Sequence, residues 1–176
     1  ETLFDGLACV SSPLDLLSCS QCIDKPRNFI YQKWLISRLK DQVLKSHYNN
    51  EDLIAKDIIK RKLKKIKTIR EFDEALTAPS WGYKSVNDYY QDASPLEKLI
   101  TFYEKLPICL FIHAKDDPWV PYKSTFKLKN LVSKRQKKFL ILITEKGGHN
   151  GFHSPKGCWS DNVVSQWINH KVNNLD

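Results

Sequence analysis

The chain has 176 residues, of which 41% are hydrophobic and 27% are charged, and its formal net charge is +8. This composition is typical of a globular domain and excludes collagens, disordered tails and membrane-spanning bundles, since no apolar run approaches the ~20 residues that cross a bilayer. The chain lacks methionine and begins at Glu1, with no leader before its first apolar run. We therefore expect it to be a fragment of a longer protein.

The first predicted elements are a strand and a long helix. Leu7 to Ser11 is a short apolar run that Ser12-Pro13 ends, which predicts a buried strand followed by a loop. From Pro26 to Tyr48 the apolar positions fall at helical intervals, and Asn49-Asn50 then breaks the pattern. The chain therefore enters a helical region soon after its first strand.

The next segment, Lys56 to Arg70, holds eight basic residues and one acidic residue, so the other 161 residues carry a net charge of only about +1. Its aliphatic residues recur at helical spacing, which predicts a single amphipathic helix with its lysines in water. These residues are Ile58, Ile59, Leu63, Ile66 and Ile69. A solvated helix is the simplest interpretation, and attraction to an anionic membrane surface is the functional alternative. We expect no nucleic-acid partner, because neither zinc-finger spacing nor a glycine-rich phosphate loop accompanies the charge.

The middle third ends in short helical segments and turns. Trp81-Gly82-Tyr83 predicts a turn, and Ser85 to Tyr90 predicts a short capped helix that stops before Ser94-Pro95. No internal repeat or low-complexity tract interrupts this region.

Two unbroken apolar runs mark the last third of the chain, Pro107 to Ala114 and Phe139 to Thr144. Runs without alternation are expected of strands that are covered on both faces of a parallel sheet. A helical pattern lies between them over Pro121 to Lys134, and Trp159, Val163, Trp167 and Ile168 predict an amphipathic terminal helix. This order of strand, helix, strand and helix predicts an α/β fold with parallel strands.

The five cysteines do not resemble a secreted disulfide framework. Cys19 and Cys22 form a C-x-x-C motif, but no second ligand pair for zinc accompanies it. Cys9, Cys109 and Cys158 stand alone in or near apolar runs and are interpreted as small buried hydrophobic residues. This usage favours a reducing compartment.

The loops that follow the two apolar runs contain the candidate chemistry, because ligand sites in open parallel sheets form at the carboxyl ends of the strands. The loop after Ala114 contains Asp116 and Asp117, and the loop after Thr144 contains His149 behind two glycines. An imidazole takes and returns a proton near neutral pH, and a carboxylate behind it fixes its tautomer. An acid and a histidine in these two loops predict the orienting half of a catalytic triad.

The same loops carry a family resemblance. H-A-K-D-D-P-W-V-P, starting at His113, and T-E-K-G-G-H-N-G-F, starting at Thr144, resemble the acid and histidine loops of α/β-hydrolases, and in particular the esterase subfamily that includes YheT, ABHD-type lipid hydrolases and EMB8-like proteins. The segment Val10 to Leu16 is similar to the strand end after the nucleophile helix of that family. Further similar segments, before the acid strand, are Ile69 to Asp73, Leu76 to Ala78, Gly82-Tyr83, Tyr89-Tyr90 and Ala93-Ser94.

The resemblance implies that Asp117 is the triad acid and His149 is the general base. Asp117 is preferred over Asp116 because hydrolase loops commonly place the acid directly before an ending such as Pro118-Trp119-Val120-Pro121. His153 and His113 are the other candidates for the base, although a hydrogen-bonded core imidazole is the better interpretation of His113. The resemblance implies neither a metal nor an organic cofactor.

The resemblance also implies the carboxyl-terminal part of an α/β-hydrolase fold in three portions. Residues 1–25 would form a core strand and loop, residues 26–96 a helical cap, and residues 97–176 the core with the acid and histidine loops. The chain contains no G-x-S-x-G, so the nucleophilic serine would lie upstream and this chain alone should not hydrolyse esters. We therefore expect the chain to be part of a serine hydrolase that acts on carboxylic esters, in particular lipid or acyl esters. The alternative is a non-catalytic binding or scaffold protein of the same fold.

Overall fold

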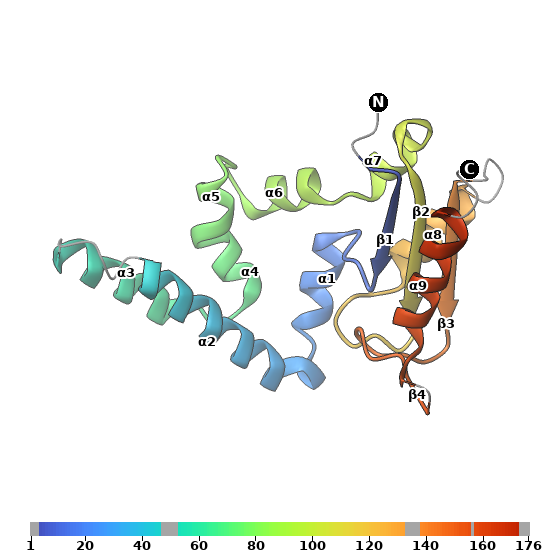
Figure 1. The fold of residues 1–176 in the computed structure, drawn as a ribbon. Coiled ribbons are helices and arrows are strands. Elements are labelled where there is room, and N and C mark those ends of the chain that lie inside the picture. The colour runs from blue at the N-terminus through green and yellow to red at the C-terminus, as the bar shows by residue number, and fades with distance from the viewer. Residues whose placement is uncertain (1–3, 47–52, 133–137, 156, 173–176) are drawn as a thin grey trace. The chain divides into compact units, whose positions relative to one another are not determined.

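The computed structural model describes residues 4–46, 53–132, 138–155 and 157–172, and the chain divides into two compact units. One unit consists of Glu1–Cys19 and Ala93–Asp176 and contains the main sheet, and the other consists of Ser20–Asp92 and is helical (Figure 1). The sequence prediction placed these boundaries at residues 25/26 and 96/97. The helical unit is thus an insertion between two strands of the sheet unit.

Three parallel strands form the main sheet. These are β1 (Gly6–Val10), β2 (Ile108–Ala114) and β3 (Phe139–Thr144), in the order β1-β2-β3, and their arrows run in the same direction in Figure 1. Ala114 pairs with Thr144, so β2 and β3 end side by side. The prediction of parallel strands flanked by helices is confirmed.

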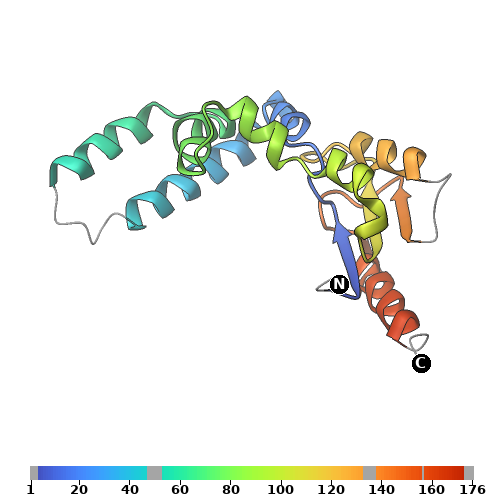
Figure 2. The same ribbon diagram turned by 90° about the horizontal axis from the view of Figure 1, so that it is seen from above.

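Helices cover both faces of the sheet, and β2 alternates its side chains between them. Cys109 and Phe111 pack toward α7 (Leu96–Thr101) and α8 (Lys123–Val132), whereas Leu110 and Ile112 pack toward α9 (Trp159–Val172). Figure 2 shows α8 on one side of the strands and α9 on the other. Because β2 is buried on both faces, its apolar run needs no alternation.

Two expectations for this unit were wrong in detail. Leu140 of β3 is 45% exposed, so β3 is not covered on both faces along its whole length among the described residues. Trp159, Val163 and Trp167 of α9 pack against the sheet as expected, but Ile168 is exposed and does not belong to that buried face.

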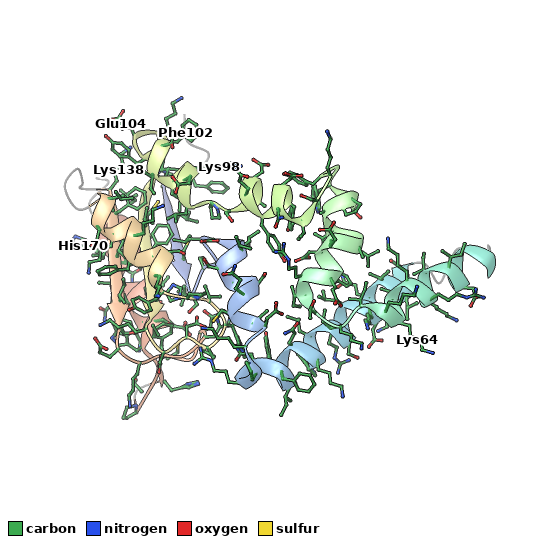
Figure 3. The ribbon with its side chains drawn as sticks, turned by 180° about the vertical axis from the view of Figure 1, so that it is seen from behind. Lys64, Lys98, Phe102, Glu104, Lys138 and His170 are labelled. Atoms are coloured by element: carbon green, nitrogen blue, oxygen red, sulfur yellow. The ribbon has the colours of Figure 1, made fainter. Side chains whose placement is uncertain are left out.

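Elements that the sequence did not predict join the strands. The helix α7 and a 3₁₀ turn, η3 (Tyr103–Lys105), lead into β2, and the hairpin of β4 (His153–Ser154) and β5 (Gly157–Cys158) leads into α9. The Lys138 ammonium donates hydrogen bonds to the carbonyls of Glu104 (2.6 Å) and Leu106 (3.0 Å), and Lys138 and Glu104 are labelled in Figure 3. These bonds tie the approach to β2 to the approach to β3.

The helical unit has its own core. The first helices along the chain are α1 (Leu16–Ile23), η1 (Pro26–Asn28), α2 (Phe29–Ser46) and α3 (Leu53–Lys65). Ile36 of α2 packs with Leu63, Ile66 and Phe72 in one cluster. The buried side chain of Gln32 donates to the carbonyl of Ile23 and accepts from the N–H of Ile69, so a polar group inside this unit is satisfied. The predicted helix from Pro26 is confirmed up to Ser46, and Asn49-Asn50 lie outside the described residues.

The basic segment 56–70 is not one helix, which corrects the sequence prediction. The helix α3 ends at Lys65, and α4 (Ile69–Phe72) begins after Thr68. Thr68 is an N-cap: its hydroxyl accepts from the N–H of Glu71 (3.1 Å), and the Glu71 carboxylate accepts from the N–H of Thr68 (3.3 Å). This reciprocal capping box starts a new helix and therefore interrupts the predicted one. Ile58 is 62% exposed, so it does not lie on the buried face.

The helical unit continues after α4 through a π-helical turn, η2 (Asp73–Thr77), then α5 (Ala78–Ser80) and α6 (Val86–Ala93). Gly82 adopts φ +79° in the predicted turn, a conformation that favours glycine. Ser85 caps α6 by accepting from the N–H of Asp88 (3.2 Å), as its position before the helix predicts.

The five cysteines all lie within the described residues and form no disulfide. Cys109 is buried as predicted, and burial raises its pKa to about 11, whereas Cys9 and Cys158 are only partly buried. In the part of the chain that the structure describes, no helix is both long enough and apolar enough to cross a membrane.

Candidate active site

The carboxyl ends of β2 and β3 bring the two candidate loops together. The N–H of Lys115 donates to the carbonyl of Thr144 (2.9 Å), so the parallel pairing continues one residue past the strands. Asp117 lies three residues after the end of β2, and its N–H donates to the carbonyl of Ala114 (3.3 Å). The sheet therefore fixes the starting points of both loops.

The carboxylate of Asp117 is held by its own loop. Its Oδ1 accepts hydrogen bonds from the N–H groups of Trp119 and Val120, both at 2.9 Å, and its side chain is fully buried. An aspartate that binds N–H groups two and three residues ahead closes a tight turn, and Pro118 suits such a turn. With Oδ1 occupied in this way, Oδ2 is left for a different partner.

That partner is His149. Its Nδ1 lies 3.0 Å from Asp117 Oδ2, and its side chain is 25% exposed. The ring of Trp119 packs against the imidazole with 4.8 Å between ring centroids. Because an ionised carboxylate only accepts, the Nδ1–H of His149 donates and Nε2 keeps its lone pair. Among the described residues, no hydrogen bond occupies Nε2.

The pKa of Asp117 lies below its ordinary value. Burial raises the pKa of this carboxyl, but the hydrogen bonds from His149 and from the N–H groups of Val120 and Trp119 lower it by more. Asp117 is therefore ionised at neutral pH, which is the state that holds the imidazole in the Nδ1–H tautomer.

His113 is a hydrogen-bonded core imidazole, as the sequence interpretation predicted. It is 1% exposed, with Nε2 3.0 Å from the carbonyl of Val120 and Nδ1 2.9 Å from the hydroxyl of Thr125. A carbonyl only accepts, so Nε2–H donates and Nδ1 accepts from Thr125. Burial lowers the pKa of His113, so it is neutral, and its 3.6 Å approach to Asp117 Oδ2 is not an ion pair at neutral pH.

The other two alternatives are placed differently. Asp116 is exposed, and its Oδ1 accepts from the N–H of Gly148 at 2.8 Å rather than from an imidazole. The exposed His153 lies in β4, and in the described ranges its side chain makes no hydrogen bond with a carboxylate. Of the residues considered from the sequence, the structure brings Asp117 and His149 together as an acid and imidazole pair.

The loop that carries His149 is a tight turn. The carbonyl of Gly147 accepts from the N–H groups of Gly151 (3.1 Å) and Phe152 (2.9 Å). A Cβ on Gly147 would lie 2.5 Å from the ring of Phe152, so no larger residue fits there without movement. The loop needs glycine at this position because the buried aromatic ring approaches its backbone closely.

Sequence reasoning missed two residues of this site. Ser11 directly follows β1 with φ +50°, and its buried hydroxyl accepts from the N–H of Asn150 at 3.3 Å. Nothing in its sequence setting indicates that contact, because the two residues are far apart in the chain. Trp119 belongs to the acid-loop motif, but its packing against His149 depends on how the loops fold.

The arrangement supplies a carboxylate, an oriented imidazole and a free Nε2, which together can accept a proton from a hydroxyl. No cluster of three His, Cys, Asp or Glu side chains within the described part of the chain could hold a metal ion. The hydrogen-bonded pair of Asp117 and His149 favours proton transfer by the imidazole.

Comparisons with known proteins show which family this chain resembles. Residues 63–174 match the model of the prolyl oligopeptidase family. The chain is 31% identical to YheT of Escherichia coli (strain K12), which is named for an inferred esterase activity. This match extends over 169 residues, or 93% of this chain and 47% of that protein. It is 28% identical to phospholipase ABHD3 of Mus musculus over 88% of this chain and 36% of the relative. It is 31% identical to monoacylglycerol lipase of Saccharomyces cerevisiae over 81% of this chain and 31% of that lipase.

The chain thus spans less than half of the length of each of these three relatives. No solved structure matches it significantly.

Proposed function

Because this chain belongs to the prolyl oligopeptidase family, among the esterase-like α/β-hydrolases, we propose that it is the carboxyl-terminal portion of a serine hydrolase that cleaves carboxylic esters. The observation that carries the proposal is the 3.0 Å hydrogen bond between His149 Nδ1 and Asp117 Oδ2, which leaves Nε2 without a hydrogen bond to any described residue.

In this proposal His149 is the general base. Nε2 takes the proton of a serine hydroxyl as the serine attacks the ester carbonyl, and the resulting imidazolium then protonates the alcohol that leaves. Asp117 stabilises the imidazolium through the same hydrogen bond that fixes the tautomer of the neutral ring. In the second half of the reaction His149 activates a water molecule, which releases the acid.

The serine is proposed to lie upstream of Glu1 in the intact protein. The chain contains no G-x-S-x-G, whereas the family presents its serine on that sharp turn before the acid and the histidine in chain order. The acid and the histidine follow that order here, and the chain spans only part of its relatives. Both observations support a nucleophile outside these 176 residues.

The proposed substrates are acyl esters, with lipid esters as the first class to test. Two relatives are named phospholipase and monoacylglycerol lipase, and both names describe enzymes that act on lipids. The helical unit Ser20–Asp92 is proposed to serve as a cap, because it is inserted between two strands of the sheet unit. Caps of this kind shield a reaction from water and shape the acyl site.

The test uses the intact protein with p-nitrophenyl esters of graded acyl length and with peptide anilides, since the matching family model is named for peptidases. We expect turnover of the esters and a fall in kcat of at least about 10³-fold in His149→Ala, because the base that activates the serine is lost. His153→Ala is the matched control, since His153 lies in the next segment and is exposed. We expect its kcat to match that of the wild type.

Three results would contradict the proposal. Absence of turnover with every ester would favour the non-catalytic scaffold, and an unchanged kcat in His149→Ala would remove the base from its role. Cleavage of the anilides in preference to the esters would replace esters by peptides as the substrate class.

A second proposal concerns the basic surface of α3 and the residues after it. Lys60, Lys64 and Lys67 are exposed, Lys64 is labelled in Figure 3, and the acidic residue Asp57 pairs with Arg61 at 2.6 Å. An exposed set of cations is attracted to anionic lipid headgroups by about 1 kcal/mol for each cation near the surface. We propose that this surface draws the protein to anionic membranes.

Sedimentation of the intact protein with phosphatidylserine vesicles and with phosphatidylcholine vesicles tests this second proposal. We expect binding to the anionic vesicles that salt weakens and that Lys60→Glu/Lys64→Glu abolishes. Equal binding of wild type and variant would contradict it.

A further inference from the structure

The peptide groups on both sides of His149 are held by side chains from other parts of the sheet. The N–H of Gly148, one residue before His149, donates to Asp116 Oδ1 at 2.8 Å. The N–H of Asn150, one residue after it, donates to Ser11 Oγ at 3.3 Å. Within the described ranges neither acceptor makes a hydrogen bond to the imidazole, and neither takes part in the proposed proton transfer.

The two acceptors come from the ends of neighbouring strands. Asp116 is the second residue after β2, and Ser11 is the first residue after β1. Those strands are paired in parallel, so their ends are fixed relative to each other. A loop held from both strands is anchored to the same sheet that positions Asp117.

The backbone at these positions explains why anchoring matters. Gly148 has φ +58° and Asn150 has φ +59°, so both residues beside His149 adopt the left-handed conformation. Glycine adopts this conformation freely, and asparagine adopts it more readily than most residues with a side chain, but the loop keeps it only where the surrounding contacts support it. The hydrogen bond from the N–H of Asn150 to Ser11 supplies one such contact.

We propose that Asp116 and Ser11 are positioning residues that hold the backbone on either side of His149 and so keep its imidazole on Asp117. This inference rests on the proposed function of His149. It assigns a role to Asp116 that differs from that of Asp117: one carboxylate in the loop orients the ring, and its neighbour orients the backbone that carries the ring.

The test measures ester hydrolysis and the imidazole itself in the intact protein. In Asp116→Ala we expect kcat to fall about 10- to 100-fold with KM within about twofold, because misplacement of a catalytic group by ~1 Å costs up to about 10²-fold. Asp116→Asn should restore most of kcat, since an amide oxygen still accepts from the N–H of Gly148. In Ser11→Ala we expect a loss of about threefold to tenfold, because its hydrogen bond is longer.

A spectroscopic readout needs no substrate. The Nδ1 proton of His149 in its hydrogen bond to Asp117 should give a far-downfield proton resonance in the wild type. We expect Asp116→Ala to shift it upfield or broaden it, and Asp116→Asn to retain it. A change of melting temperature alone, without a change in this resonance, would show a structural role only and would refute positioning.

The outcomes separate the proposed role of His149 as the general base from the proposed positioning role of Asp116 and Ser11. If His149→Ala keeps full activity, the proposed function fails whatever Asp116 does. If His149→Ala is inactive while Asp116→Ala and Ser11→Ala keep the wild-type kcat and the downfield resonance, the positioning inference alone fails.

Discussion

Replacement of Asp117 by asparagine is the sharpest perturbation that the structure offers. Oδ1 accepts two N–H groups, from Trp119 and Val120, so the amide oxygen of the variant will take that place. The amide NH₂ then faces His149 Nδ1, where Oδ2 stands in the wild type. Because NH₂ only donates, Nδ1 must accept, and the imidazole proton moves to Nε2.

This wrong tautomer sets the size of the effect. A His149 that carries its proton on Nε2 cannot accept one from a serine, and an uncharged partner no longer stabilises the imidazolium. The same substitution in a Ser-His-Asp enzyme of another fold lowers kcat by about 10⁴-fold, equivalent to about 5.4 kcal/mol. Steric disruption is small, because asparagine has the shape of aspartate and keeps both backbone hydrogen bonds.

The assay is ester hydrolysis by the intact protein, with Asp161→Asn as the matched control because Asp161 is an exposed residue in the first turn of α9. We expect a fall in kcat of about 10³- to 10⁴-fold for Asp117→Asn, with a melting temperature close to that of the wild type. For Asp161→Asn we expect no change. Activity of Asp117→Asn within about tenfold of the wild type would refute the assignment of Asp117 as the residue that orients the base.

The remaining predictions concern stability and use urea or thermal unfolding of the intact protein. Burial lowers the pKa of His113, so below pH 6.5 the unfolded chain binds a proton that the folded chain does not. The free energy of unfolding should therefore be full above pH 6.5 and fall below it by up to about 1.4 kcal/mol per pH unit. His113→Gln should lack this part of the acid sensitivity, and an equal slope in both proteins would contradict the prediction. Gly147→Ala should lower the free energy of unfolding by about 1–3 kcal/mol, because its Cβ would overlap the buried ring of Phe152. In Gly148→Ala the new Cβ has no atom within 4 Å, so only the left-handed backbone cost of about 1 kcal/mol is expected. Equal melting temperatures for the two variants would contradict the close approach of Phe152 to Gly147. Leu110→Ala, at a fully buried site, should cost about 2–5 kcal/mol, whereas Leu140→Ala at a half-exposed site should cost far less, and a ranking in the opposite order would contradict the packing of the sheet.

Features that depend on local pattern could be predicted from the sequence. The apolar runs around Phe111 and Ile141 predicted the two strands, and the unbroken run fits burial on both faces for β2 but not along the whole of β3. Asp117 and His149 could be placed together because parallel neighbouring strands end at the same edge of a sheet. The pairing of β2 with β3 supplied the geometry that this reasoning assumed.

The break within the basic segment was missed although its signal is visible. Thr68 and Glu71 have the spacing of a capping box, which marks a helix start, but the regular aliphatic spacing from Ile59 to Ile69 outweighed it. The exposure of Ile58 was missed separately, because Ile58 lies within α3, before that break. The short hairpin of β4 and β5 has too few residues for any periodic pattern.

The contacts of Ser11 and Asp116 could not be predicted, for a different reason. Each joins the histidine loop to a residue far away in the chain, so only the folded sheet brings the partners within hydrogen-bonding distance. The left-handed conformation of Ser11 carries no sequence signal either, because serine, unlike glycine or asparagine, is uncommon there.

Labelling of the intact protein with a fluorophosphonate probe, followed by peptide mapping, tests the central claim that Asp117 and His149 serve a serine nucleophile. The account predicts a single labelled serine upstream of Glu1 and a labelling rate at least about 10²-fold lower in His149→Ala than in the wild type. Undiminished labelling in His149→Ala, or a label on a serine within these 176 residues, would contradict it.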